Sequence, residues 1–277
     1  MALKDYLRRT AEFIIHGVPV KHITAKVTCT QPSEQLAGKR IIITGGGRGL
    51  GLAMAKRFVA EGAKVLIAGR NEATLKESAQ AIGCLYLKLD VRQVETFDAF
   101  MQQAFDMLGG ADCLVNNAGV SHHEGDISRV TVEDFDTQIN TNLRGAYFLT
   151  QKFLARYVPT AEKNGHILFI SSERGMMADD LPYGLTKAAV NSLVQALAVT
   201  LVGKNIRVNA VAPGVTTSDM TRVKADGDLF RASQATERVY LPEEVAETAC
   251  FLLSEASNVL NGQILVCNEG KSINFRR

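Results

Sequence analysis

The sequence predicts an α/β protein built on a doubly wound, seven-stranded parallel sheet, and two observations carry this prediction. From position 40 onward, short β-branched or apolar runs alternate with longer helical patterns, as they do in right-handed βαβ units. The first of these runs leads into a glycine-rich turn that opens directly onto a helical pattern. With 277 residues and 46% hydrophobic content, the chain can bury one substantial core.

The expected strands and helices alternate in chain order. Strands are expected at 40–44, 64–68, 84–89, 113–116, 167–171, 207–211 and 263–267. Clear helical patterns cover 49–61, 72–82, 131–157 and 183–202, with Thr131 as the N-cap of the third. Ligands of such a sheet bind beyond the carboxyl ends of its strands, so the residues that follow each strand are the candidates for function.

Residues 1–37 differ in pattern from residues 38–277, which we expect to form a single domain. The extension opens with an amphipathic helical pattern made by Leu3, Tyr6, Leu7, Phe13, Ile14 and Ile15. Gly17 and Pro19 end this pattern. Two interpretations stay open: the extension packs on the domain or a neighbouring subunit, or it forms a membrane-surface or partner helix, which its basic residues Lys4, Arg8 and Arg9 favour.

Composition and charge exclude several classes of protein. The net charge is only +2, without a basic stripe that carries aromatic residues, so we expect no nucleic-acid partner. The five cysteines are scattered without a CxxC pair, which favours reduced thiols in a cytoplasmic protein over disulfides or a zinc site. No apolar run approaches the length of about 20 residues that spans a bilayer, so we expect no membrane segment. Asp5 and Glu12, without a small-residue cleavage site, disfavour a secretory signal.

The first expected strand runs into the sequence TGGGRGLG at positions 44–51, and a helix follows at once. Glycines let the backbone turn tightly and approach a pyrophosphate, while the helix N-terminus supplies amide donors and a favourable dipole. A tight turn without a ligand is the alternative. The position of the turn, between a strand and a helix of a repeating βαβ pattern, favours dinucleotide binding.

Two further strand ends carry polar residues. Asp90 follows the third strand, where its carboxylate either accepts a hydrogen bond from an adenine amino group or caps a helix. The sequence Asn116-Asn117-Ala118-Gly119 follows the fourth strand. Small residues and amide side chains at this place can pack against a cofactor and tie neighbouring strands together, or they can form a tight turn.

A tyrosine and a lysine lie in the first turns of the helix expected at 183–202. Tyr183 and Lys187, at i and i+4, share one helix face, so the phenol and the ammonium can face one cleft. A free phenol has a pKa of about 10, and a nearby cation stabilises the phenolate, which brings proton transfer closer to neutral pH. Ser172, after the fifth strand, can hold a substrate oxygen, and Asn142 places an amide inside a helix.

These motifs, in this order and spacing, resemble the short-chain dehydrogenase/reductase superfamily over about residues 38–270, in its branch with a TGxxxGxG loop and a YxxxK pair. The resemblance implies a Rossmann fold and an oxidoreductase that interconverts a carbonyl and an alcohol. It implies a catalytic tetrad of Asn142, Ser172, Tyr183 and Lys187. Tyr183 would transfer the proton, Ser172 would orient the carbonyl, Lys187 would bind the nicotinamide ribose and tune Tyr183, and Asn142 would support a water-linked relay.

The motifs and the resemblance together predict the cofactor contacts. They are Thr44, Gly45, Gly47, Arg48, Gly49, Leu50, Gly51, Arg70, Asn71, Asp90, Val91, Asn117, Ala118, Gly119, Tyr183, Lys187, Pro213, Gly214, Val215, Thr216 and Ser218. We expect the cofactor to be NADP(H). The second strand ends Ala68-Gly69-Arg70-Asn71, without the acid that would hold both ribose hydroxyls of NAD, and Arg70 and Arg48 offer donors to a 2′-phosphate.

Three positions depart from the family's pattern. Ser172 lies eleven positions before Tyr183, fewer than usual, so the connecting loop is shortened and Ser171 stands as the alternative partner of the substrate oxygen. Ser218 replaces a threonine that usually contacts the carboxamide. Asn268-Glu269-Gly270 replaces an Asp-Gly-Gly pattern, which puts the usual subunit contacts in question.

Weaker signals complete the prediction. His122, His123 and Glu124 do not form a complete ligand set, so we expect no metal. Residues 215–240 form either a lid over the substrate or a surface loop. Apolar residues on the two long helices, Phe135, Leu143, Val190 and Leu197, predict a homo-oligomer, and the resemblance implies a homodimer or homotetramer.

Two other functions compete with catalysis of this kind. One is a nucleotide-binding scaffold or sensor of the same fold without chemistry, against which the intact Ser172, Tyr183 and Lys187 argue. The other is a sugar-nucleotide epimerase or dehydratase, which would need a larger C-terminal substrate domain than the about 60 residues that follow Pro213.

Overall fold

A parallel sheet of order β3-β2-β1-β4-β5-β6-β7 forms the centre of the chain. The computed structural model describes residues 23–24, 33–157, 164–218, 220–221, 223 and 227–273. The strands are β1 (Arg40–Thr44), β2 (Lys64–Gly69), β3 (Leu85–Lys88), β4 (Cys113–Asn116), β5 (Gly165–Ile170), β6 (Ile206–Pro213) and β7 (Ile264–Cys267). All seven strands match the expected ones to within two residues at each end, so the predicted fold class is confirmed.

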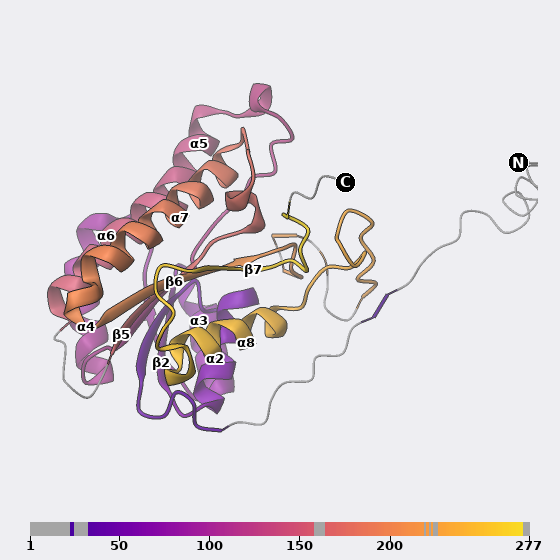
Figure 1. Cartoon of the computed structure of the whole chain (residues 1–277). Coiled ribbons are helices and arrows are strands. Elements are labelled where there is room, and N and C mark those ends of the chain that lie inside the picture. Colours follow the sequence, from indigo (N-terminus) through magenta and orange to yellow (C-terminus); the bar gives the residue numbers. More distant parts are fainter. Residues whose placement is uncertain are drawn as a thin grey trace, which may run out of the picture.

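Helices cover both faces of this sheet (Figure 1). They are α2 (Gly49–Ala60), α3 (Glu72–Ile82), α4 (Phe97–Leu108), α5 (Val132–Gln138), α6 (Ala146–Arg156), α7 (Pro182–Leu201) and α8 (Pro242–Leu253). In Figure 1, α2, α3 and α8 lie on one side of the strands, and α4, α6 and α7 lie on the other. The strand order reverses between β1 and β4, which is where a doubly wound sheet opens a crevice at its carboxyl edge.

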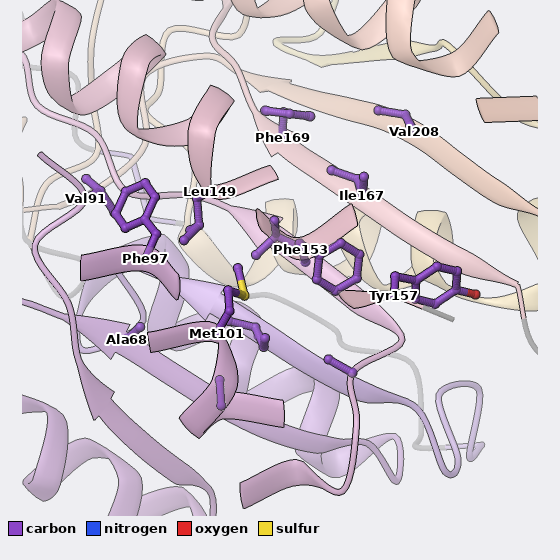
Figure 2. Packing of buried hydrophobic residues seen from close by; sticks show 14 of the residues in the cluster. Ala68, Val91, Phe97, Met101, Leu149, Phe153, Tyr157, Ile167, Phe169 and Val208 are labelled. Carbon is purple, nitrogen blue, oxygen red and sulfur yellow. The ribbon is translucent and has the colours of Figure 1, made fainter. Parts of the chain in front are cut away.

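Alternation along the strands divides the core between the two faces. On β1, Ile42 packs toward the cluster of α4, α6 and α7, while Ile41 and Ile43 pack into the cluster of α2 and α8. Figure 2 shows the first cluster, where Phe153 of α6 packs beside Tyr157 and over the sheet. Both layers of helices are therefore attached to one rigid sheet, which fixes the positions of the strand ends.

The helix expected at 131–157 is interrupted in the structure. Thr131 caps α5 as expected, because its Oγ1 accepts a hydrogen bond of 3.1 Å from the amide of Asp134. The next turns, Ile139–Gly145, form a π-helix before α6 continues. Gly145 lies so close to the end of β3 that a Cβ there would be 2.3 Å from the carbonyl oxygen of Val91. The spacing of apolar residues along the chain does not indicate such a wider turn, so the sequence predicts one continuous helix here.

Most of the N-terminal extension, including its expected amphipathic helix, lies outside the described residues. Ile23 is described, and it pairs with the segment before α8: its carbonyl accepts from the amide of Leu229 at 3.0 Å, and its amide donates to Asp228 Oδ1 at 3.1 Å. Closer to β1, the amides of Ser33 and Gln35 both donate to the Glu61 carboxylate. The described part of the extension is thus bound to the body of the protein.

One helical stretch corrects the expectation that no apolar run approaches a membrane-spanning length. Pro182–Lys204, which is α7 and the turn after it, is long and apolar enough to cross a membrane, judged by length and composition only, with a mean hydropathy of 1.5. The core helix of a globular protein passes the same test, so one such helix is weak evidence. Here Val190, Val194 and Ala198 of α7 are buried against the sheet.

The aromatic stack in Figure 2 leads to a prediction about stability. Phe153 is fully buried, with its ring centroid 5.7 Å from that of Tyr157 and 6.0 Å from that of Phe105. Phe153→Ala should therefore lower the free energy of unfolding by about 3–5 kcal/mol in urea titrations. The half-exposed Phe251 offers a matched control, and Phe251→Ala should cost less than about 1 kcal/mol. Equal losses in the two variants would contradict this assignment of the core.

Candidate active site

A cleft of about 1480 Å³ opens at the carboxyl edge of the sheet. Loops that follow β1, β2, β4, β5 and β6 line it, together with the first turns of α7. Of the predicted catalytic and cofactor-binding residues, all line this cleft except Thr44 and Asn142. The structure therefore brings into one place residues that are separated by more than 150 positions in the sequence.

The glycine-rich turn forms a tight cradle at one end of the cleft. Gly45 and Gly49 have positive φ angles of 66° and 53°, which favour glycine. At Gly51 a Cβ would lie 2.2 Å from the carbonyl oxygen of Gly45, so only glycine lets α2 start this close to the turn. No side chain caps the start of α2, and its first turn carries no acid. Its amides can therefore donate to an anion, and this end of the cleft fits a pyrophosphate.

Hydrogen bonds join the glycine-rich turn to the turn after β4. Thr44 Oγ1 accepts from the amides of Asn117 at 3.1 Å and Ala118 at 3.0 Å. In return, Asn117 Nδ2 donates to the carbonyl oxygens of Thr44 at 2.8 Å and Gly45 at 3.1 Å. We call these four bonds the strand latch. The latch holds the ends of β1 and β4 together at the point where the strand order reverses.

The far end of the cleft, beyond β2 and β3, carries several charges. Arg70 follows β2, is exposed and lines the cleft, and Arg48 lines it from the glycine-rich turn. Asn71 lines it too, but its side chain also caps α3 by accepting from the amide of Thr74 at 3.1 Å. The Asp90 carboxylate is held by Arg92, with an Nη2 to Oδ2 distance of 2.6 Å, and this bond keeps the pKa of Asp90 below its usual value.

Tyr183, Lys187 and Ser172 meet at the other end of the cleft. The Lys187 ammonium is buried, donates to the carbonyl oxygen of Ile170 at 2.7 Å and lies 5.6 Å from the centre of the Tyr183 ring. Burial lowers the pKa of Lys187 to about 8. Burial also raises the pKa of Tyr183, while its hydrogen bond with Ser172 and the charge of Arg174 act in the opposite direction. The phenol thus stays protonated beside a cation, a pair suited to proton transfer.

Asn142 lies behind this cluster, in the π-helix, and not at the surface of the cleft. Its amide makes a reciprocal pair with the backbone of Val120, at 2.8 and 2.9 Å, and its Nδ2 donates to Thr186 Oγ1 at 3.2 Å. A Cβ at Gly119 would lie 3.4 Å from Asn142 Oδ1 and 3.7 Å from Lys187 Nζ. Asn142 therefore connects the loop after β4 to the start of α7.

The two serines after β5 have different surroundings. Ser171 Oγ donates to Asn191 Oδ1 at 2.6 Å and lies 3.4 Å from the carbonyl oxygen of Lys187, so α7 engages its hydroxyl. Ser172 is the residue that hydrogen bonds with Tyr183. Of the two alternatives, this geometry favours Ser172 as the partner of a substrate oxygen.

The shortened loop between Ser172 and Tyr183 is held by an ion pair within it. Arg174 contacts Asp179 through two bonds of 2.5 Å, and Asp179 Oδ1 also accepts from the amide of Leu181 at 3.0 Å. At Gly184 a Cβ would lie 2.0 Å from Asp179 Oδ2, so the absence of a side chain makes room for this carboxylate. The loop can be short because Asp179 packs directly onto the start of α7.

Two histidines and one buried acid complete the described surroundings of the cleft. His122 Nδ1 lies 3.1 Å from Asp134, and His123 Nε2 lies 2.9 Å from the carbonyl oxygen of Met220. No group of three potential metal ligands occurs in the part of the chain that the structure describes. Glu173, which no sequence motif marks, lines the cleft beside Ser172 and accepts hydrogen bonds from Lys271 and Asn268.

The chain is similar to several known proteins. The family model described as Enoyl-(Acyl carrier protein) reductase matches residues 45–272. An uncharacterized oxidoreductase of Mycobacterium bovis is 35% identical over 86% of this chain and 98% of its own. The L-fucose dehydrogenase of Bos taurus is 32% identical over 83% of this chain and 88% of its own. The crystal structure of 3-ketoacyl-(acyl-carrier-protein) reductase from Brucella melitensis complexed with NADH is 33% identical, with a TM-score of 0.80, and covers 86% of this chain and 100% of its own.

The buried Lys187 ammonium generates a prediction about stability and pH. Its folded pKa of about 8 lies below the ordinary value of 10.5, so charging it weakens the folded state at every pH below about 8. This penalty disappears as the pH rises toward 10.5. Lys187→Met should therefore stabilise the cofactor-free protein by about 1–3 kcal/mol at pH 7, and the gain should shrink toward pH 10. Urea titrations at both pH values test this, and a gain that grows with pH would contradict it.

Proposed function

This chain belongs to the short-chain dehydrogenase/reductase family, and we propose that it is an NADP(H)-dependent oxidoreductase that interconverts a carbonyl group and a secondary alcohol by hydride transfer. The observation that carries the proposal is the cluster of Tyr183, Ser172 and buried Lys187 at one end of a cleft whose other end fits a pyrophosphate. The names of the relatives support oxidoreductase activity and a nicotinamide cofactor. The cofactor's phosphate and the roles of the residues are our proposal.

In this proposal Tyr183, Ser172, Lys187 and Asn142 have different tasks. The nicotinamide, when bound, supplies hydride to the carbonyl carbon or accepts it from the alcohol carbon. Tyr183 donates its phenolic proton to the carbonyl oxygen during reduction and accepts it back during oxidation. Ser172 donates a hydrogen bond that orients this oxygen. Lys187 binds the ribose hydroxyls and favours the phenolate, and Asn142 supports a relay that returns the proton from water.

The relatives do not narrow the substrate beyond a carbonyl or an alcohol. Two that are about equally identical to this chain are named as a 3-ketoacyl-(acyl-carrier-protein) reductase and an L-fucose dehydrogenase. A panel of ketones, sugars and 3-ketoacyl thioesters, followed by nicotinamide absorbance, tests the proposal. Turnover of at least one class is expected. Cofactor binding without turnover of any class would favour the alternative of a nucleotide-binding scaffold or sensor.

We propose a cytoplasmic location, since Cys84, Cys113, Cys250 and Cys267 are free thiols.

Tyr183→Phe should abolish turnover and leave cofactor binding nearly unchanged. The substitution removes the proton donor but keeps the ring, and general acid catalysis contributes about 10² to 10⁴-fold. Steady-state kinetics and calorimetric binding of NADPH measure the two effects. A Phe variant that keeps more than about a tenth of the wild-type kcat would show that another group transfers the proton.

The preference for NADP(H) rests on the residues after β2. Arg70 lines the cleft there with an exposed side chain, and its charge helps to lower the pKa of Asp90. Glu72, the first acid after the strand, already belongs to the first turn of α3. Arg48 lines the same cleft from the glycine-rich turn. Two charge-assisted bonds to a 2′-phosphate, at about 1.5 to 3 kcal/mol each before solvent exposure is taken into account, would favour NADP(H) by at least about tenfold.

The ratio of kcat/KM for NADPH to that for NADH tests this preference. We expect a ratio of at least about ten in the wild type, and a fall toward one in the Arg70→Ala, Arg48→Ala double variant. Lys76→Ala, on the helix that follows Arg70, serves as a control that removes a nearby surface charge. Equal use of both cofactors by the wild type, or an unchanged ratio in the double variant, would overturn the assignment.

We also propose a homo-oligomer that is joined through the outer sides of α5, α6 and α7. Exposed apolar side chains on these helices include Phe135, Tyr147, Leu185 and Val199. Val190, which the sequence analysis expects on this surface, is instead 2% exposed and packs into the protein's own core. Leu143 and Leu197 are partly buried against the same core. The periodicity of α7 alone does not separate its inner from its outer apolar residues.

Light scattering at micromolar concentration should give the mass of a dimer or a tetramer, since this apolar surface is costly to leave in water. Tyr147→Glu should shift the mass toward that of a monomer, while Val259→Glu, which changes an exposed residue after α8, should leave it unchanged. A monomeric wild type would contradict the proposal.

A further inference from the structure

The segment after β7 reaches back into the active-site region and places a cation beside a buried carboxylate. Lys271 Nζ lies 2.8 Å from Glu173 Oε1, and Asn268 Nδ2 donates to Glu173 Oε2 at 3.1 Å. Glu173 follows Ser172 directly, lines the cleft and is only 4% exposed. Two side chains of the C-terminal segment thus bind this buried carboxylate.

We propose that Glu173 and Lys271 are positioning residues of the reaction: the pair holds the loop that carries Ser172, and Lys271 balances the negative charge that Glu173 brings to the cleft wall that Tyr183 also lines. The C-terminal segment is thereby part of the active site. This inference rests on the proposed function, in which Tyr183 transfers the proton.

The charges around Tyr183 show why a counter-ion is needed. Lys187, also on α7, lies close to the Tyr183 ring. On the loop after β5, the charge of Glu173 raises the pKa of Tyr183, and the charge of Arg174 lowers it. Arg174 is already paired with Asp179 at 2.5 Å. His122 and His123 from the loop after β4 and Arg231 from the segment before α8 also line the cleft. Lys271 is the cation that contacts Glu173 itself.

The pair also connects three parts of the cleft wall that are distant in sequence. Besides Glu173, Lys271 Nζ contacts the side-chain oxygen of Gln234 at 3.3 Å, in the segment expected as a lid. Glu269, two residues earlier, accepts hydrogen bonds from Thr236 and from the Tyr240 hydroxyl, the latter at 3.2 Å. The loop after β5, the expected lid and the C-terminal segment are thus joined through one polar network, with Glu173 at its buried end.

Opposite single substitutions test the electrostatic part of this inference. Lys271→Met leaves Glu173 without its cation, so the pKa of Tyr183 should rise. Glu173→Gln removes the anion and leaves the cation, so the pKa of Tyr183 should fall. The pH at which kcat/KM for carbonyl reduction declines should therefore move up in Lys271→Met and down in Glu173→Gln, by about half a pH unit or more. The double variant should return close to the wild-type value.

A matched control pair lies at the opposite edge of the sheet. Lys39 and Glu255 are also 2.8 Å apart, before β1 and after α8, so Lys39→Met removes an ion pair of equal length away from the cleft. It should leave the pH profile unchanged. Lys271→Arg keeps the charge and should restore the wild-type profile.

A second readout needs no substrate. Ultraviolet absorbance of tyrosinate, taken as the difference between each protein and its Tyr183→Phe counterpart, reports the ionisation of Tyr183 alone and should shift in the same two directions. Shifts of equal sign in both single variants, or no shift in either readout, would overturn the inference and leave only a structural role for the pair. If instead the Tyr183→Phe proteins keep full activity, the proposed function fails, while the absorbance titration still decides on the charge pair.

Discussion

The strand latch between Thr44 and Asn117 is the interaction on which the rest of the site depends. It joins the glycine-rich turn after β1 to the turn after β4 where the strand order reverses, and both partners use side chain and backbone. Thr44 does not line the cleft, yet it sets the distance between the two loops that do. From this fixed point the cradle at the start of α2 lies on one side and the cluster of Tyr183, Ser172 and Lys187 on the other.

Burial gives the site its chemistry and makes it costly to fold. The core on the face of α4, α6 and α7 holds α7 rigidly, so the ammonium of Lys187 stays in a poorly solvated position with the carbonyl of Ile170 as its bonded partner. Glu173 is buried nearby with partners from the C-terminal segment. Charged groups in such places usually lower the stability of the fold, and they are characteristic of sites where proton transfer is tuned.

The sequence predicted what depends on local pattern and on motif. The seven strands, the cap at Thr131 and the loops that meet at the carboxyl edge follow from periodicity and turn residues. The π-helix around Asn142 was not predicted: it ends where Gly145 approaches Val91, a contact across 54 positions that a local pattern does not show. The sequence alone left Ser171 and Ser172 as alternatives, since the answer depends on what each hydroxyl contacts.

Long-range charge pairs were beyond prediction for the same physical reason. Glu173 and Lys271 lie 98 positions apart, and each alone looks like an ordinary surface residue. Asn268-Glu269-Gly270 departs from the family's usual pattern, and this segment contacts both Glu173 and the expected lid. The departure from the family's pattern therefore lies in the segment that makes these contacts, but it does not indicate what the segment does.

The most direct test of the account is to trace the transferred hydrogen. NADPH carrying deuterium at both C4 positions of its nicotinamide is incubated with the carbonyl compound that the panel shows to be reduced fastest, and the alcohol is analysed by mass spectrometry. The account predicts one deuterium on the carbinol carbon and a hydroxyl proton that exchanges with water. An alcohol without deuterium on that carbon, or with a hydrogen there that comes from solvent, would contradict it.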